Sequence, residues 1–119
     1  MAIVRIPHDT PASEAIATGK EKLIAGDPNQ GAANLFSDPS GRFHCGIWQA
    51  EPATWRVSYS EHEYCHLLEG RILIRGDDGT ETLFEAGDSF VVPLGFSGTW
   101  QVLEKARKVY VIYEPAAIG

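Results

Sequence analysis

Short apolar stretches recur along most of the chain, and polar or glycine-containing stretches separate them. Turn-forming sequences such as SDPSG, RGDDGTE, EAGD and PLGFSG lie in between. Many short strands at this spacing, with no convincing long helical pattern, predict an all-β sandwich or barrel. The predicted strands cover residues 33–36, 43–50, 54–59, 63–68, 71–75, 81–86, 88–93, 99–104 and 107–114.

The first 32 residues do not show this rhythm. Residues 13–23, SEAIATGKEKL, are compatible with a helical turn that Ser13 would cap. Residues 26–34, GDPNQGAAN, have the composition of a loop. Further along, Asp77-Asp78-Gly79 predicts a hairpin turn between two strands.

Composition mainly excludes certain classes of protein and partner. The net charge is −6 and the ten basic residues are scattered, which argues against a nucleic-acid partner and against anionic membranes. No apolar run approaches the ~20 residues of a membrane span, and the first residues do not resemble a secretory signal. Cys45 and Cys65 fit neither a disulfide framework nor a C-x-x-C motif. We therefore expect a cytoplasmic protein with reduced thiols.

Two glycine-containing motifs narrow the fold class. In EYCHLLEG, Glu63 is followed by Gly70, and in GDSFVVPLG, Gly87 precedes Pro93 and Gly95. Glycine suits a tight strand junction, and proline ends a strand because it has no N–H group to donate. The order and spacing of the motifs, with the hairpin RILIRGDDGTETLFEA between them, resemble the two signature motifs of the cupins. The resemblance implies a single-domain jelly-roll β-barrel of the RmlC-like cupin type.

Over residues 43–113 the chain also resembles the cupin subfamily related to the (S)-ureidoglycine aminohydrolase cupin domain. This resemblance implies a cupin barrel at residues 43–115, preceded by an N-terminal arm and edge strands at residues 1–42, in one domain over 1–119. It also implies a homodimer, because cupins of this kind commonly pair through one sheet and a small barrel leaves sheet edges to be covered.

The resemblance makes the metal site look degenerate. Metal-binding cupins use two histidines, a glutamate and a later histidine, and these positions here are Val57, Tyr59, Glu63 and Gly98. One of four expected ligands is present, so we predict no firmly bound metal or other cofactor. A weakly bound divalent metal stays open, with Glu63 and either His62 or His66 as its ligands. Strand alternation directs these two histidines away from Glu63.

Alternation along the strands also predicts a pocket. If Glu63 faces the interior, Cys65 does so too, and the neighbouring strands turn residues of matching parity toward it. The predicted ligand-binding pocket consists of Trp55, Val57, Cys65, Gly98 and Trp100, with Glu63 and Tyr59 as candidate catalytic residues. Lys108 would be a natural partner for Glu63 if its face of the last strand points inward, which the sequence does not fix.

Glu63 has two interpretations. An isolated carboxylate among indoles loses hydration, which favours its neutral form and suits a general acid or base. Alternatively, a hydrogen-bonding partner satisfies Glu63 and it has no chemical role. The tryptophans either bind an aromatic or cationic ligand or simply pack in the core. Cys65 fits best as a small buried apolar residue.

The sequence therefore predicts a cupin that binds a small molecule, with a degenerate metal site and acid–base chemistry on a small nitrogenous or carbohydrate-like metabolite as a further step. Two alternatives stay open: a non-catalytic ligand-binding, accessory or sensor cupin, and a metal-dependent aminohydrolase resembling ureidoglycine aminohydrolase. Whether the protein is an enzyme is not decided by the sequence.

Overall fold

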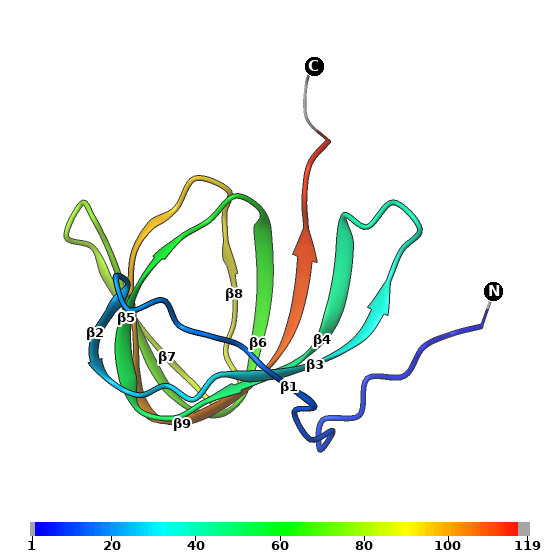
Figure 1. Cartoon of the computed structure of the whole chain (residues 1–119), viewed down its shortest axis with the longest axis horizontal. Coiled ribbons are helices and arrows are strands. Elements are labelled where there is room, and N and C mark those ends of the chain that lie inside the picture. The colour runs from blue at the N-terminus through cyan, green and yellow to red at the C-terminus, as the bar shows by residue number, and fades with distance from the viewer. Residues whose placement is uncertain (1, 117–119) are drawn as a thin grey trace.

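Antiparallel strands make up the regular structure of residues 2–116, the part of the chain that this computed structural model describes (Figure 1). The prediction of an all-β, jelly-roll cupin fold is confirmed. Within the described range, no helix is long and apolar enough to cross a membrane. The strands are β1 (Glu14–Ala15), β2 (Leu23–Gly26), β3 (Gly31–Ser37), β4 (Phe43–Ala50), β5 (Ala53–Ser58), β6 (His62–Gly76), β7 (Glu81–Glu85), β8 (Ser89–Val92) and β9 (Ser97–Tyr113).

The two longest strands, β6 and β9, form the centre of the sheet. They pair with each other from His62 opposite Tyr113 to Gly76 opposite Gly98. One half of β9 also pairs with β4 and the other half with β5, while β6 also pairs with β7 and β8. The sheet curls into a half-open barrel, as Figure 1 shows, and the buried core lies on its concave side.

Gly70 lets β6 bend without ending. We predicted two strands, 63–68 and 71–75, but the structure contains one strand with register shifts around this glycine. Gly70 has a φ of +92°, a conformation that glycine adopts without strain. The irregularity also reverses the alternation, because odd-numbered side chains such as Cys65 are buried before it and even-numbered ones such as Ile72 after it.

The other turn predictions hold more simply. β8 ends at Val92, directly before Pro93, as expected for a residue that cannot donate a ladder hydrogen bond. The turn between β6 and β7 contains Gly79 with a φ of +89°. Across it, the N–H group of Gly76 donates to the carbonyl of Thr80 at 2.9 Å.

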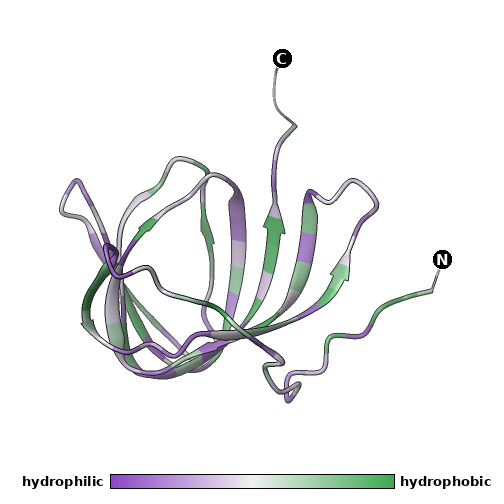
Figure 2. Cartoon of the chain, viewed as in Figure 1, coloured by the Kyte–Doolittle hydropathy of each residue, from purple (hydrophilic) through white to green (hydrophobic). Residues whose placement is uncertain are grey.

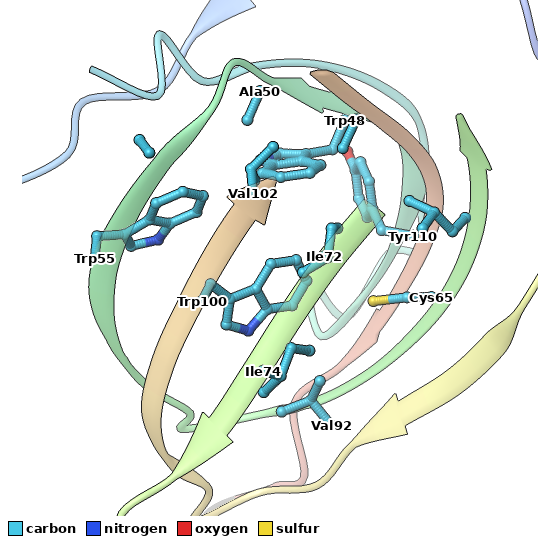
Figure 3. Packing of buried hydrophobic residues seen from close by; sticks show 13 residues of the cluster. Trp48, Ala50, Trp55, Cys65, Ile72, Ile74, Val92, Trp100, Val102 and Tyr110 are labelled. Atoms are coloured by element: carbon cyan, nitrogen blue, oxygen red, sulfur yellow. The ribbon is translucent and has the colours of Figure 1, made fainter. Parts of the chain in front are cut away.

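The core is aromatic at its centre and aliphatic around it. Hydrophobic and hydrophilic residues alternate along the central strands (Figure 2), so each strand turns one apolar face inward. Trp48, Trp55 and Trp100 gather inside the curl, with aliphatic residues such as Ile72 and Val102 packed beside them (Figure 3). These side chains are at most 7% exposed.

The N-terminal region corrects one prediction. No helix begins at Ser13; instead β1 pairs with β3 and β2 pairs with β5, so the segment runs along two edges of the sheet. A single turn lies between these strands, where the N–H groups of Lys22 and Leu23 donate to the carbonyl of Gly19 at 2.9 and 3.1 Å. The sequence there has no apolar helical period, and its backbone groups find partners on distant strands. The connecting residues 16–22 cross the open side of the barrel between β1 and β2 (Figure 1).

Arg107 on β9 ties the N-terminal arm to the sheet. Its Nη2 donates to the carbonyls of His8 at 2.7 Å and Thr10 at 2.8 Å, and its Nη1 donates to Gln49 Oε1 at 3.0 Å. We expect Arg107→Ala to lower the free energy of unfolding by about 1.5–3 kcal/mol, because charge-assisted hydrogen bonds are lost. Limited proteolysis should then cleave the arm faster. In the control Arg42→Ala, the exposed side chain that is removed makes no hydrogen bond within residues 2–116, and cleavage should be unchanged.

Candidate functional site

The concave side of the sheet encloses a cavity of about 470 Å³. Aromatic side chains form one part of its wall, beside the Glu63 carboxylate and the Lys108 ammonium, and Glu61, Arg56 and Lys22 add further charged groups to the lining. Residues 16–19 and Lys22 of the β1–β2 connection contribute to its rim. The central lining side chains are Trp48, Trp55, Val57, Tyr59, Glu63, Trp100, Lys108 and Tyr110.

Three indoles from three strands form the aromatic wall. Trp48 lies on β4, Trp55 on β5 and Trp100 on β9. The ring centroids of Trp48 and Trp100 are 5.7 Å apart, and those of Trp55 lie 6.4 Å from each of the other two. These separations are in the range of favourable aromatic contacts. Trp48 was absent from the predicted pocket, because β4 is buried on both faces and its burial does not alternate.

Glu63 and Lys108 form a buried ion pair at the centre of the cavity. Lys108 Nζ donates to Glu63 Oε2 at 3.2 Å, and the two residues are 3% and 7% exposed. β9 pairs on one side with β4, where Lys108 lies opposite Trp48, and on the other with β6. This double pairing turns the even-numbered residues of β9 inward. The conditional expectation that Lys108 would be the partner of Glu63 is thus confirmed.

The second oxygen of Glu63 is also hydrogen-bonded. Tyr59 donates its hydroxyl proton to Glu63 Oε1 at 2.8 Å. Glu63 is therefore not an isolated carboxylate among indoles, because both of its oxygens accept hydrogen bonds. Burial and the neighbouring charge of Glu63 raise the pKa of Tyr59, so this phenol stays protonated. For Lys108, burial lowers the pKa while its neighbours Cys65 and Glu63 raise it, and the net direction is upward.

Cys65 lies beneath the ion pair. It is fully buried, and Lys108 Nζ lies 3.4 Å from its Sγ. Burial raises the pKa of the Cys65 thiol to about 12, with the Lys108 charge opposing the rise. Because the thiolate is the reactive form, this cysteine is a poor nucleophile at neutral pH.

We expect the Cys65 thiol to resist alkylation by iodoacetamide in the folded protein at pH 8 and to react after unfolding. Its ordinary pKa is ~8.5, so as the pH rises the unfolded chain releases the proton before the folded one does. The contribution of this thiol to stability is therefore complete below about pH 8 and is lost as the pH approaches 12. Mass spectrometry of native and denatured samples measures the alkylation. Rapid native labelling of Cys65 would contradict the prediction.

Polar side chains at the rim form a second set that the sequence did not reveal. The Tyr110 hydroxyl donates to Asn34 Oδ1 at 2.8 Å, and Trp48 Nε1 donates to Gln30 Oε1 at 3.0 Å. Gln30 Nε2 in turn donates to Thr18 Oγ1 at 2.8 Å, which links the β1–β2 connection to the aromatic wall. Gln30 lies in a region that looked like a loop in sequence, and Asn34 lies where that region overlaps the predicted strand 33–36. The pairing of β3, which begins directly after Gln30, with β4 brings both side chains to the cavity.

Of the predicted site residues, most line the cavity and two do not. Trp55, Val57, Tyr59, Glu63 and Trp100 line it. Cys65 is a correction, because it is fully buried and contacts Lys108 Nζ but is not among the lining residues. Gly98 is a correction: it is not among the lining residues, and a Cβ added there would collide with the carbonyl oxygen of Arg75 on β6. The close approach of the two strands fills the space that a side chain would need.

The two candidate histidine ligands point elsewhere. His62 Nδ1 accepts a hydrogen bond from the N–H group of Leu94 at 3.0 Å, and its ring stacks on Tyr113. His66 Nδ1 lies 2.7 Å from Ser89 Oγ. The candidate metal ligands, Glu63 with either His62 or His66, are therefore not brought together.

The side chains present do not fit the metal of the metal-binding cupins. Val57 has no donor atom, the Gly98 position is closed by backbone, and Glu63 is already paired with an ammonium. Tyr59 uses its proton to bind Glu63. Within residues 2–116, no three His, Cys, Asp or Glu side chains gather in a way that could hold an ion. We therefore assign no step to a metal.

A curled jelly-roll sheet around an aromatic cavity defines a small cupin. More narrowly, the chain belongs to the EutQ-like cupin family, because the model of the EutQ-like cupin domain matches residues 37–110, more than half of its length. No curated protein is significantly similar to it in sequence. The narrower resemblance to the ureidoglycine aminohydrolase domain stays a prediction.

Solved structures agree with this fold. The EutQ protein of Clostridium difficile is 22% identical, with 88% of this chain and 81% of that chain covered and a TM-score of 0.73. A DUF861-family protein of unknown function from Pseudomonas syringae pv. tomato is also 22% identical, with 90% and 46% covered and a TM-score of 0.83. An ethanolamine utilization protein Q from Salmonella typhimurium is 24% identical, with 74% and 72% covered and a TM-score of 0.65. At these identities the similarity shows the fold alone.

Proposed function

We propose that the protein binds a small molecule in the tryptophan-lined cavity, with Glu63 as the hydrogen-bond acceptor that orients it. The observation that carries the proposal is a buried ion pair that faces an aromatic cavity. A buried ion pair is often no more stabilising than apolar residues of the same volume, so its presence here calls for another reason. A cavity of about 470 Å³ lies within the usual range for small-molecule sites.

The lining favours a small nitrogenous or carbohydrate-like metabolite. Such molecules carry N–H or O–H groups, and the carboxylate oxygens of Glu63 have lone pairs that accept them. They also present flat or apolar faces that pack on the indoles of Trp55 and Trp100. Asn34 and Gln30 at the rim add further polar contacts. Polar groups that converge on a cavity beside apolar and aromatic side chains are what orients a ligand in a specific site.

Binding is better supported than catalysis. Glu63 accepts hydrogen bonds from Tyr59 and Lys108, so taking up a proton during a reaction would disturb one of them. Acid–base chemistry at Glu63 therefore requires the ligand to displace a partner first. For this reason a non-catalytic ligand-binding or sensor role ranks ahead of an enzymatic one. A metal-dependent aminohydrolase would need ligands that the cavity lining does not offer.

A thermal-shift screen tests the proposal. We would screen ureido compounds, amino acids and sugars, and also ethanolamine, because the name of the Salmonella protein points to it. A ligand at 100 times its dissociation constant stabilises a protein by about 2.7 kcal/mol. At least one compound should raise the Tm of the wild type and lose its effect in Glu63→Gln. The control Glu81→Gln, far from the cavity on β7, should respond like the wild type. If hits act equally on Glu63→Gln, the cavity centre is not the site.

The homodimer also stays a proposal. Several large apolar side chains on the strands around β6 and β9 are exposed, including Tyr64 at 42%, Val91 at 60% and Tyr113 at 48%. A second copy of the chain that packs against this side would cover them. Light scattering should give about twice the 13.0 kDa of one chain, and a monomer at all concentrations would remove the proposal.

A further inference from the structure

The surroundings of the Lys108 amine have the composition of a site for a free cation. Its Nζ lies 4.2 Å from the ring centroid of Trp100 and 4.6 Å from that of Trp48. The Glu63 carboxylate completes the set at 3.2 Å. Aromatic faces combined with a carboxylate are the arrangement by which proteins recognise ammonium ligands. Here the cation is one of the protein's own side chains.

The position of Lys108 is fixed by the sheet. β9 is hydrogen-bonded on both sides at this point, to β4 and to β6, so the backbone of Lys108 cannot shift without breaking the central pairing. The amine also lies 3.4 Å from Cys65 Sγ. The residue is 3% exposed, so the cage around its amine is filled.

We propose that Lys108 is a specificity-determining residue. Its ammonium group fills the cation cage formed by Trp48, Trp100 and Glu63. The cage therefore excludes free ammonium groups and metal ions, and the cavity accepts ligands whose part next to the cage is neutral. The exclusion acts at this cage and is both steric and electrostatic, because a second cation there would meet the charge of Lys108 while Glu63 is already neutralised. Glu61 also lines the cavity but lies outside this cage. The statement about ligands rests on the proposed function. The statement about the cage does not, because it concerns only Lys108 and its neighbours.

Removing the tether should open the cage. Lys108→Ala deletes three carbons and the amine, and n-propylammonium has the same atoms. 1-Propanol serves as the neutral probe of nearly the same shape. Isothermal titration would compare both probes on wild type, on Lys108→Ala and on the double variant Lys108→Ala/Glu63→Gln. Zinc chloride would be titrated in parallel.

We expect n-propylammonium to bind Lys108→Ala at least about tenfold more tightly than it binds the wild type, since desolvated cation–π and ionic contacts are regained. 1-Propanol should show no such gain, and the double variant should lose it. Zinc should not bind the wild type stoichiometrically. Equal binding of n-propylammonium to wild type and variant, equal gains for 1-propanol, or stoichiometric zinc on the wild type would each overturn the proposal.

The test stays decisive if Lys108→Ala does not fold alone. In that case n-propylammonium, added during refolding, should restore the near-ultraviolet circular dichroism of the packed indoles and a cooperative thermal transition. Failure of the ammonium probe to do so, or equal success with 1-propanol, would refute the cage. These readouts need no natural ligand. A failed metabolite screen would therefore count against the proposed function and leave this inference standing.

Discussion

Replacing Lys108 with methionine is expected to lower the free energy of unfolding by about 3–5 kcal/mol, because the substitution leaves the Glu63 carboxylate buried without its cation. Methionine keeps most of the volume and the apolar character of the lysine stem, so the packing against Trp48 and Trp100 is retained. The loss therefore reports the charge and not a cavity. Chemical denaturation followed by tryptophan fluorescence measures it directly, since the indoles lie within the affected cluster.

The double variant Lys108→Met/Glu63→Gln separates the cost of one unpaired charge from the worth of the pair. With both charges removed, stability should return to within about 1–2 kcal/mol of the wild type, as neutral replacements of buried ion pairs often do. Tyr59 can still donate its hydroxyl proton to the glutamine oxygen. If the double variant were as unstable as Lys108→Met alone, the single-variant loss would come from disturbed packing, and the ion pair would not explain it.

The sequence predicted those pocket residues whose inward or outward direction follows from strand alternation alone. Trp55, Tyr59 and Glu63 lie in stretches with a clear period of two, and the structure brings them to one cavity with Trp100. Their parity relative to one another is a local property of the backbone. The cupin fold followed from two glycine-containing motifs whose spacing is equally local.

The remaining residues depended on contacts between distant strands. Trp48 was missed because β4 is covered on both faces, so no alternation marks its inner side. The inward face of Lys108 is set by the pairing of β9 with β4 and β6 together. Gly98 was misplaced because the backbone of Arg75 comes too close for a side chain, a fact of tertiary packing. The N-terminal strands form only because β3 and β5 offer them open edges.

Gly70 is where the local and the tertiary requirements meet. Gly70→Ala should lower the free energy of unfolding by about 3–5 kcal/mol, combining the strain of a positive φ with overpacking. A Cβ at this position would meet the carbonyl oxygen of Lys105, and would lie 2.7 Å from that of Glu104 and 2.8 Å from the Cα of Ala106. These are backbone atoms in the middle of β9, so they cannot move aside as a flexible side chain would.

Gly79 provides a matched control, because its φ of +89° is almost the same and no atom lies within 4 Å of the position of an added Cβ. Gly79→Ala should cost only the backbone strain, about 1–2 kcal/mol. Urea denaturation of the two variants gives the difference directly. A larger loss in Gly70→Ala would show that the bend in β6 exists because β9 passes directly against it. Since this bend is where the alternation of β6 reverses, it also lets residues on both sides of Gly70 face the same core. Equal losses of unfolding free energy in the two variants would mean that only the positive φ matters and that the backbone of β9 shifts to make room for the added Cβ.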